Sequence, residues 1–391
     1  MTGRTRANPH RLVWCLIGAA TLAGACLLIA GGASMTRAAF PGKPGKIVFQ
    51  SDVGGADEEI VVINANGTGR DVLTSNDLRE FTPAFSPNGR RIVFEREVGG
   101  DSEIIVMNAN GTGAENITND DTDESDPSFS PNGRKIVFRR VGPPADIWVM
   151  NADGTGEAQL TDDLDDDNAP VFSPNGRKIA WQHKVGAVEE LFIMNADGSN
   201  EEPVGADPGD EFEPQFSPDG RRIVFFRCDD PDCDIFIMNA NGGGQTPLTE
   251  NDLDEYDAAF APNGAKIVFA RDVGGASDLF VMKPNGSRQR PVKTTASASD
   301  DFPNWQPIPV QCGGRRATLV GTPGSDTLVG TPGADVISGQ GGADTLKGKG
   351  GRDRLCGNGG KDRLKGGDGR DRCIGAGGAD RATSCERERS I

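Results

Sequence analysis

Phe129-Ser-Pro-Asn-Gly-Arg-Lys-Ile-Val-Phe138, followed by Ile147-Trp-Val-Met-Asn-Ala-Asp-Gly154, is the stretch that decides the fold of this chain. Its first phrase recurs with spacings of 44, 43, 44 and 44 residues, at Phe85, Phe129, Phe172, Phe216 and Phe260. Its second phrase recurs at Asn64, Asn108, Asn151, Asn195 and Asn239, with a sixth, variant copy at Lys283-Pro-Asn-Gly286. A fixed period of this length indicates a propeller or a solenoid.

Each copy predicts four short strands. Runs such as Ile136–Phe138 and Ile147–Met150 are β-branched and aromatic, which favours strands. Pro-Asn-Gly and Ala-Asp-Gly supply residues that tolerate positive φ in tight turns. No copy contains an amphipathic pattern of helical length. Six copies of a four-stranded unit predict an all-β fold built on a six-bladed β-propeller.

The two ends of the repeat region are complementary. The first copy begins at Gly45-Lys-Ile-Val-Phe49 and lacks the Phe-Ser-Pro strand. The missing strand stands at the other end, as Phe302-Pro-Asn-Trp-Gln-Pro307. We therefore expect this last strand to complete the first blade and to close the ring without a covalent bond.

The repeated phrase Pro-x-Phe-Ser-Pro-Asn-Gly-x-x-Ile-Val-Phe, followed by Ile-x-Val-Met-Asn-Ala-Asp-Gly, resembles the repeat of TolB-type β-propellers over residues 45–307. The resemblance implies a six-bladed, non-catalytic, exported interaction module. It does not imply the Tol system itself, because the residues before the first copy leave no room for the amino-terminal domain of true TolB proteins.

The amino terminus predicts export. Arg4, Arg6 and Arg11 precede the uncharged stretch 12–30, and Gly31-Gly-Ala33 is typical of a cleavage site. This pattern indicates a secretory signal over residues 1–39, with a retained membrane anchor or lipidation at Cys26 as alternatives. We therefore expect a secreted or cell-envelope protein.

Six cysteines follow this segment, and an even number in an exported chain favours disulfides. Cys228 and Cys233 lie in one predicted hairpin and favour a local bridge. A metal or redox site there is the alternative, but no histidine is nearby in sequence. For the tail we expect the pairs Cys312–Cys356 and Cys373–Cys385.

Charge is divided unevenly along the chain. The net charge is −17, yet the first 39 residues carry four arginines and no acid, and the segment from Cys312 onward carries 14 basic and 10 acidic residues. The propeller region therefore carries −25. Such a charge keeps an exported protein soluble and repels nucleic acid and anionic membrane surfaces. We expect no nucleic-acid partner, no membrane partner after signal removal, and a monomer.

An acid recurs five residues before each repeated Phe or its Trp equivalent, at Glu80, Glu124, Asp167, Glu211, Glu255 and Asp300. One hypothesis is an acidic ring at the channel mouth that binds a cation or a basic partner. The other is an internally paired belt, because hairpin register brings each acid near a recurring basic position. That position holds Arg96, Arg140, His183, Arg227 and Arg271, with Ser51 in the first blade.

After a short linker the period changes to nine. From Gly321 onward, Gly occupies positions one and four of seven copies, and a large apolar residue occupies position eight before fading to Cys373 and Ala382. Position six is always aspartate, at Asp326, Asp335, Asp344, Asp353, Asp362, Asp371 and Asp380. This pattern resembles the RTX, or haemolysin-type, calcium-binding repeat and implies a parallel β-roll.

Glycine turns and carboxylates offer the oxygen ligands that Ca²⁺ prefers. We therefore expect Ca²⁺ as the cofactor and the position-six aspartates as its ligands. One aliphatic side chain per nine residues is a thin core, so ion binding is expected to supply folding free energy. The later copies are basic, from Lys347 to Arg372, which disfavours cations there. The first three or four aspartates are therefore the best candidates.

The predicted domains are a signal at 1–39, a propeller at 40–307, a linker at 308–320, a roll at 321–383 and a tail at 384–391. The chain lacks a Gly-x-Ser-x-Gly elbow, a His-Glu-x-x-His motif, a P-loop and paired Cys-x-x-Cys. We expect no enzyme, and instead an exported calcium-binding protein whose propeller engages a protein or glycan. The alternative is a structural envelope protein attached to wall polymer through its basic tail. A hydrolase or lyase using the acidic loops is the third hypothesis.

Overall fold

The computed structural model describes residues 42–52, 57–205, 209–229, 232–292, 298–321 and 324–389. The predicted signal segment lies outside these residues. All regular structure in the described residues is β, as predicted. Among these residues there is no helix with the length and apolar character needed to span a membrane.

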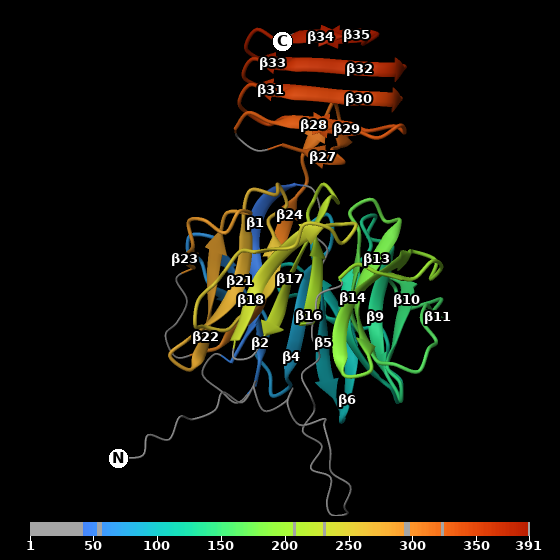
Figure 1. Ribbon diagram of the computed structural model, residues 1–391, viewed down its shortest axis with the longest axis vertical. Coiled ribbons are helices and arrows are strands. Elements are labelled where there is room, and N and C mark those ends of the chain that lie inside the picture. Colours follow the sequence, from blue (N-terminus) through green and yellow to red (C-terminus); the bar gives the residue numbers. More distant parts are fainter. Residues whose placement is uncertain are drawn as a thin grey trace, which may run out of the picture.

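Six antiparallel sheets of four strands form the blades of a propeller (Figure 1). Blade 1 contains β24 (Asp300–Ile308), β1 (Lys43–Ser51), β2 (Glu59–Asn64) and β3 (Asp71–Val72). Blade 2 contains β4 (Glu80–Phe85), β5 (Arg91–Val98), β6 (Asp101–Asn108) and β7 (Glu115–Asn116). Blade 3 contains β8 (Asp123–Phe129), β9 (Lys135–Val141), β10 (Asp146–Asn151) and β11 (Ala158–Gln159).

The other three blades repeat this order. Blade 4 contains β12 (Asp167–Phe172), β13 (Lys178–Val185), β14 (Val188–Asn195) and β15 (Glu202–Pro203). Blade 5 contains β16 (Asp210–Phe216), β17 (Arg222–Asp229), β18 (Asp232–Asn239) and β19 (Thr246–Pro247). Blade 6 contains β20 (Glu255–Phe260), β21 (Ile267–Val273), β22 (Ala276–Met282) and β23 (Arg290–Pro291). The predicted six-bladed propeller is confirmed.

The last propeller strand closes the ring. β24 pairs with β1 in antiparallel register, with Trp305 opposite Ile47 and Asp300 opposite Ser51. Trp305 is buried among the apolar residues of blades 1 and 6. The Asn304 side chain accepts a hydrogen bond from the Phe85 N–H of blade 2 at 3.0 Å. β24 therefore completes blade 1 and contacts both of its neighbours, blade 6 and blade 2. The complementary ends of the repeat region predicted this closure.

The first strand of each blade lies innermost, and these six strands contact one another around the ring. Each carries a β-bulge two residues after the recurring acid, at a residue with φ between 54° and 68°. The six residues are Thr82, Asp126, Ala169, Glu213, Asp257 and Phe302. At three of these residues the backbone N–H donates a hydrogen bond to a side chain of the preceding blade. The donor and acceptor residues are Thr82 and Gln50, Ala169 and Asp126, and Phe302 and Asp257. The bulge therefore joins neighbouring blades around the channel.

Strand direction separates the two faces of the propeller. The innermost strands of blades 2 to 6 each begin after a loop with acidic residues and end at a Pro-Asn-Gly or equivalent turn, and β24 runs in the same direction. The second domain follows the end of β24, so it lies on the turn face, away from the acidic loops (Figure 1). Arg316 donates a hydrogen bond to the Pro87 carbonyl on this face, and Gln306 donates one to the Gly89 carbonyl at 2.8 Å.

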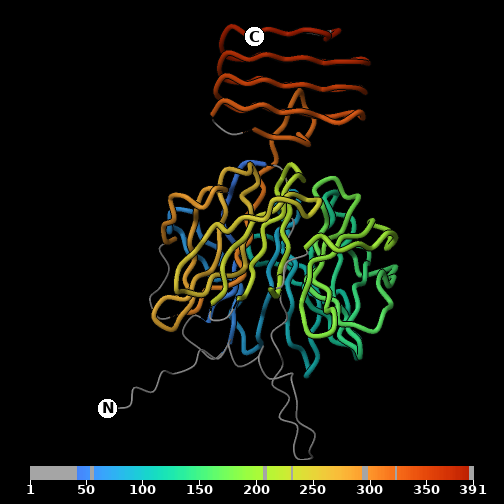
Figure 2. Tube along the Cα trace, in the orientation of Figure 1, coloured from blue at the N-terminus to red at the C-terminus, as the bar shows by residue number. Residues whose placement is uncertain are grey.

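The second domain is a roll of two parallel sheets. One sheet contains β27 (Leu319–Val320), β29 (Val336–Ser338), β31 (Arg354–Gly359), β33 (Arg372–Gly377) and β35 (Arg387–Arg389). The other contains β28 (Thr327–Val329), β30 (Thr345–Gly351), β32 (Arg363–Gly369) and β34 (Arg381–Thr383). Figure 2 shows their stacked turns beyond the propeller. Position eight fills the predicted thin core, with Ile337, Leu346, Leu355, Leu364 and Cys373 buried.

The roll is longer than the predicted range 321–383. The segment predicted as a linker contains a short hairpin of β25 (Gln311–Cys312) and β26 (Arg315–Arg316), and then β27, which already belongs to the roll. Residues 317–320 form a degenerate copy in which Ala317 replaces the aspartate, so the Gly–Asp pattern misses it. The predicted tail contains β35, which pairs with β33.

The three predicted disulfides are present: Cys228–Cys233, Cys312–Cys356 and Cys373–Cys385. The first joins directly opposed residues of the β17–β18 hairpin. The second joins β25, in the short hairpin, to β31 of the roll. The third joins β33 to Cys385, which follows β34. The two bridges in the roll close the domain at its beginning and at its end.

Candidate calcium sites and the acidic belt

The position-six aspartates stack along the two edges of the roll, 18 residues apart. From the third copy onward, one carboxylate oxygen of each accepts the backbone N–H of the aspartate 18 residues earlier. Asp344 Oδ1 accepts from Asp326 at 2.8 Å, and Asp362 Oδ1 accepts from Asp344 at 2.8 Å. Asp353 and Asp371 make the same bonds on the other edge. These bonds form a ladder that fixes one oxygen of each accepting carboxylate, and the second oxygen takes no part in the ladder.

That second oxygen is the strongest sign of a cation site. In the four middle copies it is buried and has no hydrogen-bond partner among the described residues: Asp344, Asp353, Asp362 and Asp371. The four residues are 1–3% exposed. A buried carboxylate oxygen without a donor costs free energy, so it requires a missing partner such as a water or an ion. An oxygen-seeking cation meets that requirement.

The position-one glycines show where further oxygens converge. A Cβ on Gly348 would stand 2.1 Å from Asp353 Oδ2 and 2.3 Å from the Gly366 carbonyl oxygen. A Cβ on Gly339 would stand 2.2 Å from Asp344 Oδ2 and 2.9 Å from the Gly357 carbonyl oxygen. Carboxylate and carbonyl oxygens of successive turns therefore share a cradle that only glycine leaves open. These donors fit Ca²⁺, which binds six to eight oxygens.

The electrostatics of the ladder agree with a cation. Burial, together with the charges of neighbouring aspartates, raises the pKa of Asp344 to about 6 and that of Asp353 to about 6. Burial also raises the pKa of Asp362. The backbone N–H bonds oppose these shifts but do not cancel them. Without a cation, Asp344 and Asp353 therefore ionise only at a higher pH than an ordinary aspartate, and their charged forms are destabilised by burial and by the neighbouring aspartates.

The ends of the ladder differ from its middle. Asp335 Oδ2 already accepts hydrogen bonds from the Thr331 N–H and hydroxyl, at 2.7 Å and 3.0 Å. Asp326 and Asp380 are only half-buried. The geometry therefore favours the four middle aspartates as calcium ligands, whereas the sequence favoured the first three or four aspartates. Basic residues of the later copies led the sequence analysis to disfavour cations there. Two of these residues, Lys347 and Arg363, are exposed on the outside of the roll.

The six recurring acids of the propeller are brought together, but as buried members of ion pairs. All six are at most 1% exposed. Arg96, Arg140, Arg227 and Arg271 bind Glu80, Glu124, Glu211 and Glu255 at 2.8, 2.8, 2.6 and 2.6 Å. In blade 1, Asp300 accepts from Ser51 at 2.6 Å and from Arg70 at 3.2 Å. This arrangement is the internally paired belt, and we call these six acids with their partners the acidic belt.

Aromatic rings hold the belt arginines in place. Arg140 lies 4.5 Å from the ring centre of Trp148, and Arg271 lies 4.7 Å from that of Phe280. Burial nevertheless raises the pKa of Glu80 to about 7, and it also raises the pKa values of Glu124 and Asp300. The belt therefore joins the first two strands of each blade, and it presents little carboxylate surface to a partner.

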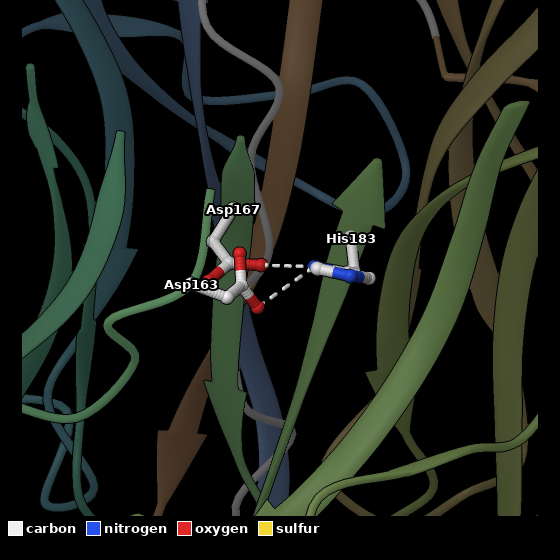
Figure 3. A group of neighbouring side chains, drawn as sticks. All are labelled: Asp163, Asp167 and His183. Carbon is white, nitrogen blue, oxygen red and sulfur yellow. Dashed lines mark hydrogen bonds and ion pairs between the residues drawn. The ribbon is translucent and has the colours of Figure 1, made fainter. Parts of the chain in front are cut away.

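In blade 4 the belt contains histidine instead of arginine. Figure 3 shows Asp163 and Asp167 beside His183. His183 Nδ1 lies 2.7 Å from Asp167 Oδ1 and 3.8 Å from Asp163 Oδ2. The Trp181 indole donates to the same Asp167 oxygen at 2.8 Å. A hydrogen bond to Asp167 raises the pKa of His183.

Comparison with known families agrees with both domains. Residues 32–210 and 147–308 match the TolB beta propeller domain. The chain belongs to the TolB propeller family. Residues 320–355 and 348–382 of this TolB-type chain match the RTX calcium-binding nonapeptide repeat. The RTX repeats imply calcium binding, in accord with the donor set of the roll. A search of curated proteins gives no match.

Solved structures support the fold of this TolB-family propeller. TolB from Acinetobacter baumannii superposes with a TM-score of 0.60 at 20% identity, covering 67% of this chain and 67% of that one. TolB from Agrobacterium tumefaciens superposes with a TM-score of 0.54 at 18% identity, covering 68% of this chain and 92% of that one. A chain of a nidogen/laminin complex superposes with a TM-score of 0.57 at 13% identity, covering 67% of this chain and 98% of that one. At these identities the likeness concerns the fold alone.

Proposed function

We propose that this protein is an exported, non-enzymatic, calcium-stabilised binding protein. Its roll takes up Ca²⁺ through the four middle aspartates, and its propeller acts as an interaction module for a protein or a glycan. The observation that carries the proposal is the set of buried carboxylate oxygens without donors, beside the glycine cradles of the roll. Three disulfides support an oxidising compartment outside the cytoplasm.

The belt geometry argues against a hydrolase or lyase that uses the recurring acids. A glycosidase needs two carboxyl groups that reach a substrate from opposite sides of a bond. The six belt acids are instead buried and bonded within the blades. We therefore assign them to the stability of the loops and not to acid–base chemistry.

Calcium titration of the full chain by calorimetry and circular dichroism tests the proposal. We expect Ca²⁺ to increase the β signal at neutral pH. Gly348→Ala places a Cβ against Asp353 Oδ2 and should weaken binding strongly. Gly333→Ala is the matched control, because its Cβ would meet nothing closer than 3.6 Å and its φ is not positive. Equal calcium affinity in the two variants would contradict the assignment of the cradle.

A second function, attachment to an anionic polymer of the cell envelope, is favoured by the outer face of the roll. Lys347 stands opposite Lys365 in parallel register, and Arg363 stands opposite Arg381. All four are exposed. Adjacent strands are about 4.8 Å apart, so like charges repeat at that spacing and repel one another. A polyanion with regularly spaced charges would relieve this repulsion.

Charge removal on this face is expected to abolish retention on an anionic polymer. The change is Lys347→Gln, Arg363→Gln, Lys365→Gln and Arg381→Gln together, measured by co-sedimentation with a teichoic-acid-type polyphosphate and with a neutral glycan, in Ca²⁺. We expect binding of the unmodified chain to the polyphosphate alone and a loss of at least about tenfold in the variant. Arg90→Gln with Arg134→Gln, in exposed propeller turns, is the control and should bind normally. Retention by the neutral glycan, or an unchanged variant, would argue against attachment by charge.

A further inference from the structure

Blade 4 differs from the rest of the belt in a way that changes its chemistry. Four blades place arginine beside the recurring acid, and a guanidinium has no lone pair to offer a metal. His183 occupies the equivalent position, opposite Asp167 in the strand register. An imidazole nitrogen can exchange its proton for a metal ion. This is the only belt position in the described blades where a nitrogen ligand faces carboxylates.

The distances suit a small tetrahedral ion. One ligand atom each from Asp163, Asp167 and His183 lies within 4.8 Å of the others. Zinc bonds of about 2.0–2.1 Å place tetrahedral ligand atoms about 3.3 Å apart. The observed separations from His183 Nδ1, 2.7 Å to Asp167 and 3.8 Å to Asp163, lie on either side of that value. Shifts of about half an ångström would therefore give the tetrahedral spacing (Figure 3).

A second observation concerns the buried carboxylate oxygens. Glu80, Glu124 and Glu255 of the belt each have a second oxygen without a hydrogen-bond partner among the described residues, but only in blade 4 does such a carboxylate lie beside a nitrogen that can bind a metal. Asp167 is fully buried, and its Oδ2 has no hydrogen-bond partner in the described structure. Asp146, at the start of β10 in blade 3, is half-buried, and its Oδ1 also lacks a hydrogen-bond partner among the described residues. Burial and the charges of Asp167 and Asp163 raise the pKa of Asp146 to about 6, and burial with the same charges raises that of Glu201. One imidazole therefore stands against several crowded carboxylates.

We propose that Asp163, Asp167 and His183 bind a divalent transition-metal ion of the zinc type where the chain enters blade 4. The ion takes the place of the proton between His183 Nδ1 and Asp167 Oδ1, and that proton is released to solvent. It also gives the Asp167 Oδ2 oxygen a partner. A Ca²⁺ ion fits less well, since it prefers an all-oxygen shell.

Zinc titration of the full chain at pH 7.5, with Ca²⁺ saturating the roll, tests this site. We expect one zinc ion per chain by calorimetry. His183→Arg restores the residue that four other blades carry, so it should fold while losing at least about 100-fold in zinc affinity. Its calcium titration should be unchanged. No zinc binding by the unmodified chain, or unchanged affinity in His183→Arg, would overturn the proposal.

Two further measurements keep the test decisive if His183→Arg is unstable. Asp163→Asn leaves the His183–Asp167 pair intact and should weaken zinc binding about tenfold or more. The chain has only two histidines, so the imidazole ¹⁵N spectrum resolves His183 directly. Zinc should shift the Nδ1 resonance in the unmodified chain. An unshifted resonance at saturating zinc, or full affinity in Asp163→Asn, would refute the site.

Discussion

At pH 7.5, removal of calcium with a chelator is expected to unfold most of the roll and to leave the propeller folded. The physical reason lies in the aspartate ladder. Its four middle carboxylates are buried, and each has an oxygen that no donor within the described residues satisfies. When these groups ionise without a cation, mutual repulsion and desolvation oppose folding. Bound Ca²⁺ removes both penalties, so its binding free energy becomes folding free energy.

In the absence of calcium, low pH should stabilise the roll in part, because protonation removes the charges that calcium would otherwise neutralise. The folded pKa of Asp344 is about 6 and that of Asp353 is about 6, raised first by burial and then by neighbouring aspartates. An unfolded aspartate titrates near 3.9. Because the folded pKa is the higher one, these groups stabilise the roll fully below about pH 4, and this contribution is lost as the pH rises through about 6. The calcium-free roll should therefore melt at a higher temperature at acidic pH than at pH 7.5.

Thermal melts in chelator and in Ca²⁺, followed by circular dichroism from pH 4 to pH 8, measure this effect. The difference between the two melts should be large at pH 7.5 and small at pH 4, since calcium binds the ionised carboxylates. The propeller needs its own control, because burial raises the pKa of Glu80 to about 7 and that of Glu95 to about 8. A chain ending at Ile308 supplies that control and should show no calcium dependence. A roll that melts identically with and without calcium at pH 7.5 would contradict the ladder as a calcium site.

Local chemistry explains how much of this structure the sequence could predict. Each blade repeats its own strands and turns, so periodicity alone indicated six blades, and the complementary ends at Gly45 and Pro307 indicated closure. The belt pairs also follow from hairpin register, since each acid lies opposite its basic partner. The nonapeptide pattern placed the aspartates at the turns and the aliphatic residues in the core.

What the sequence could not show depends on contacts between turns and between blades. The positive φ at Thr82 and Phe302 is imposed by the bulge and has no residue signal, since neither is glycine. The hydrogen bonds from Thr331 to Asp335 depend on how one turn folds back on itself. The degenerate copy lacks an aspartate and joins the roll through strand pairing, with Leu319 opposite Ile337 and Val320 opposite Ser338. The Thr331 hydrogen bonds change the ranking of the calcium sites, and the degenerate copy changes the boundary of the roll.

A chain ending at Ser299 is expected to lose the propeller fold, whereas one ending at Ile308 keeps it. The two differ only by β24, which supplies the innermost strand of blade 1 and pairs with β1 along its length. Truncating one buried Trp such as Trp305 costs about 3–5 kcal/mol, and the lost strand also removes the Asn304–Phe85 bond and the Asp300–Arg70 ion pair. The total is comparable with the 5–15 kcal/mol that typically stabilises a folded domain.

The measurement is a thermal or urea melt of each truncated chain, with size-exclusion chromatography to detect expansion. The chain ending at Ile308 should melt cooperatively and elute as a compact monomer. The chain ending at Ser299 should elute as an expanded or aggregated species, because β1 and the neighbouring β4 and β20 lose the strand that lies between them. Adding a peptide of residues 299–308 in trans should restore part of the cooperative transition, since the strand acts through non-covalent pairing. A compact, cooperative chain ending at Ser299 would mean that the ring is held by the other five blades alone.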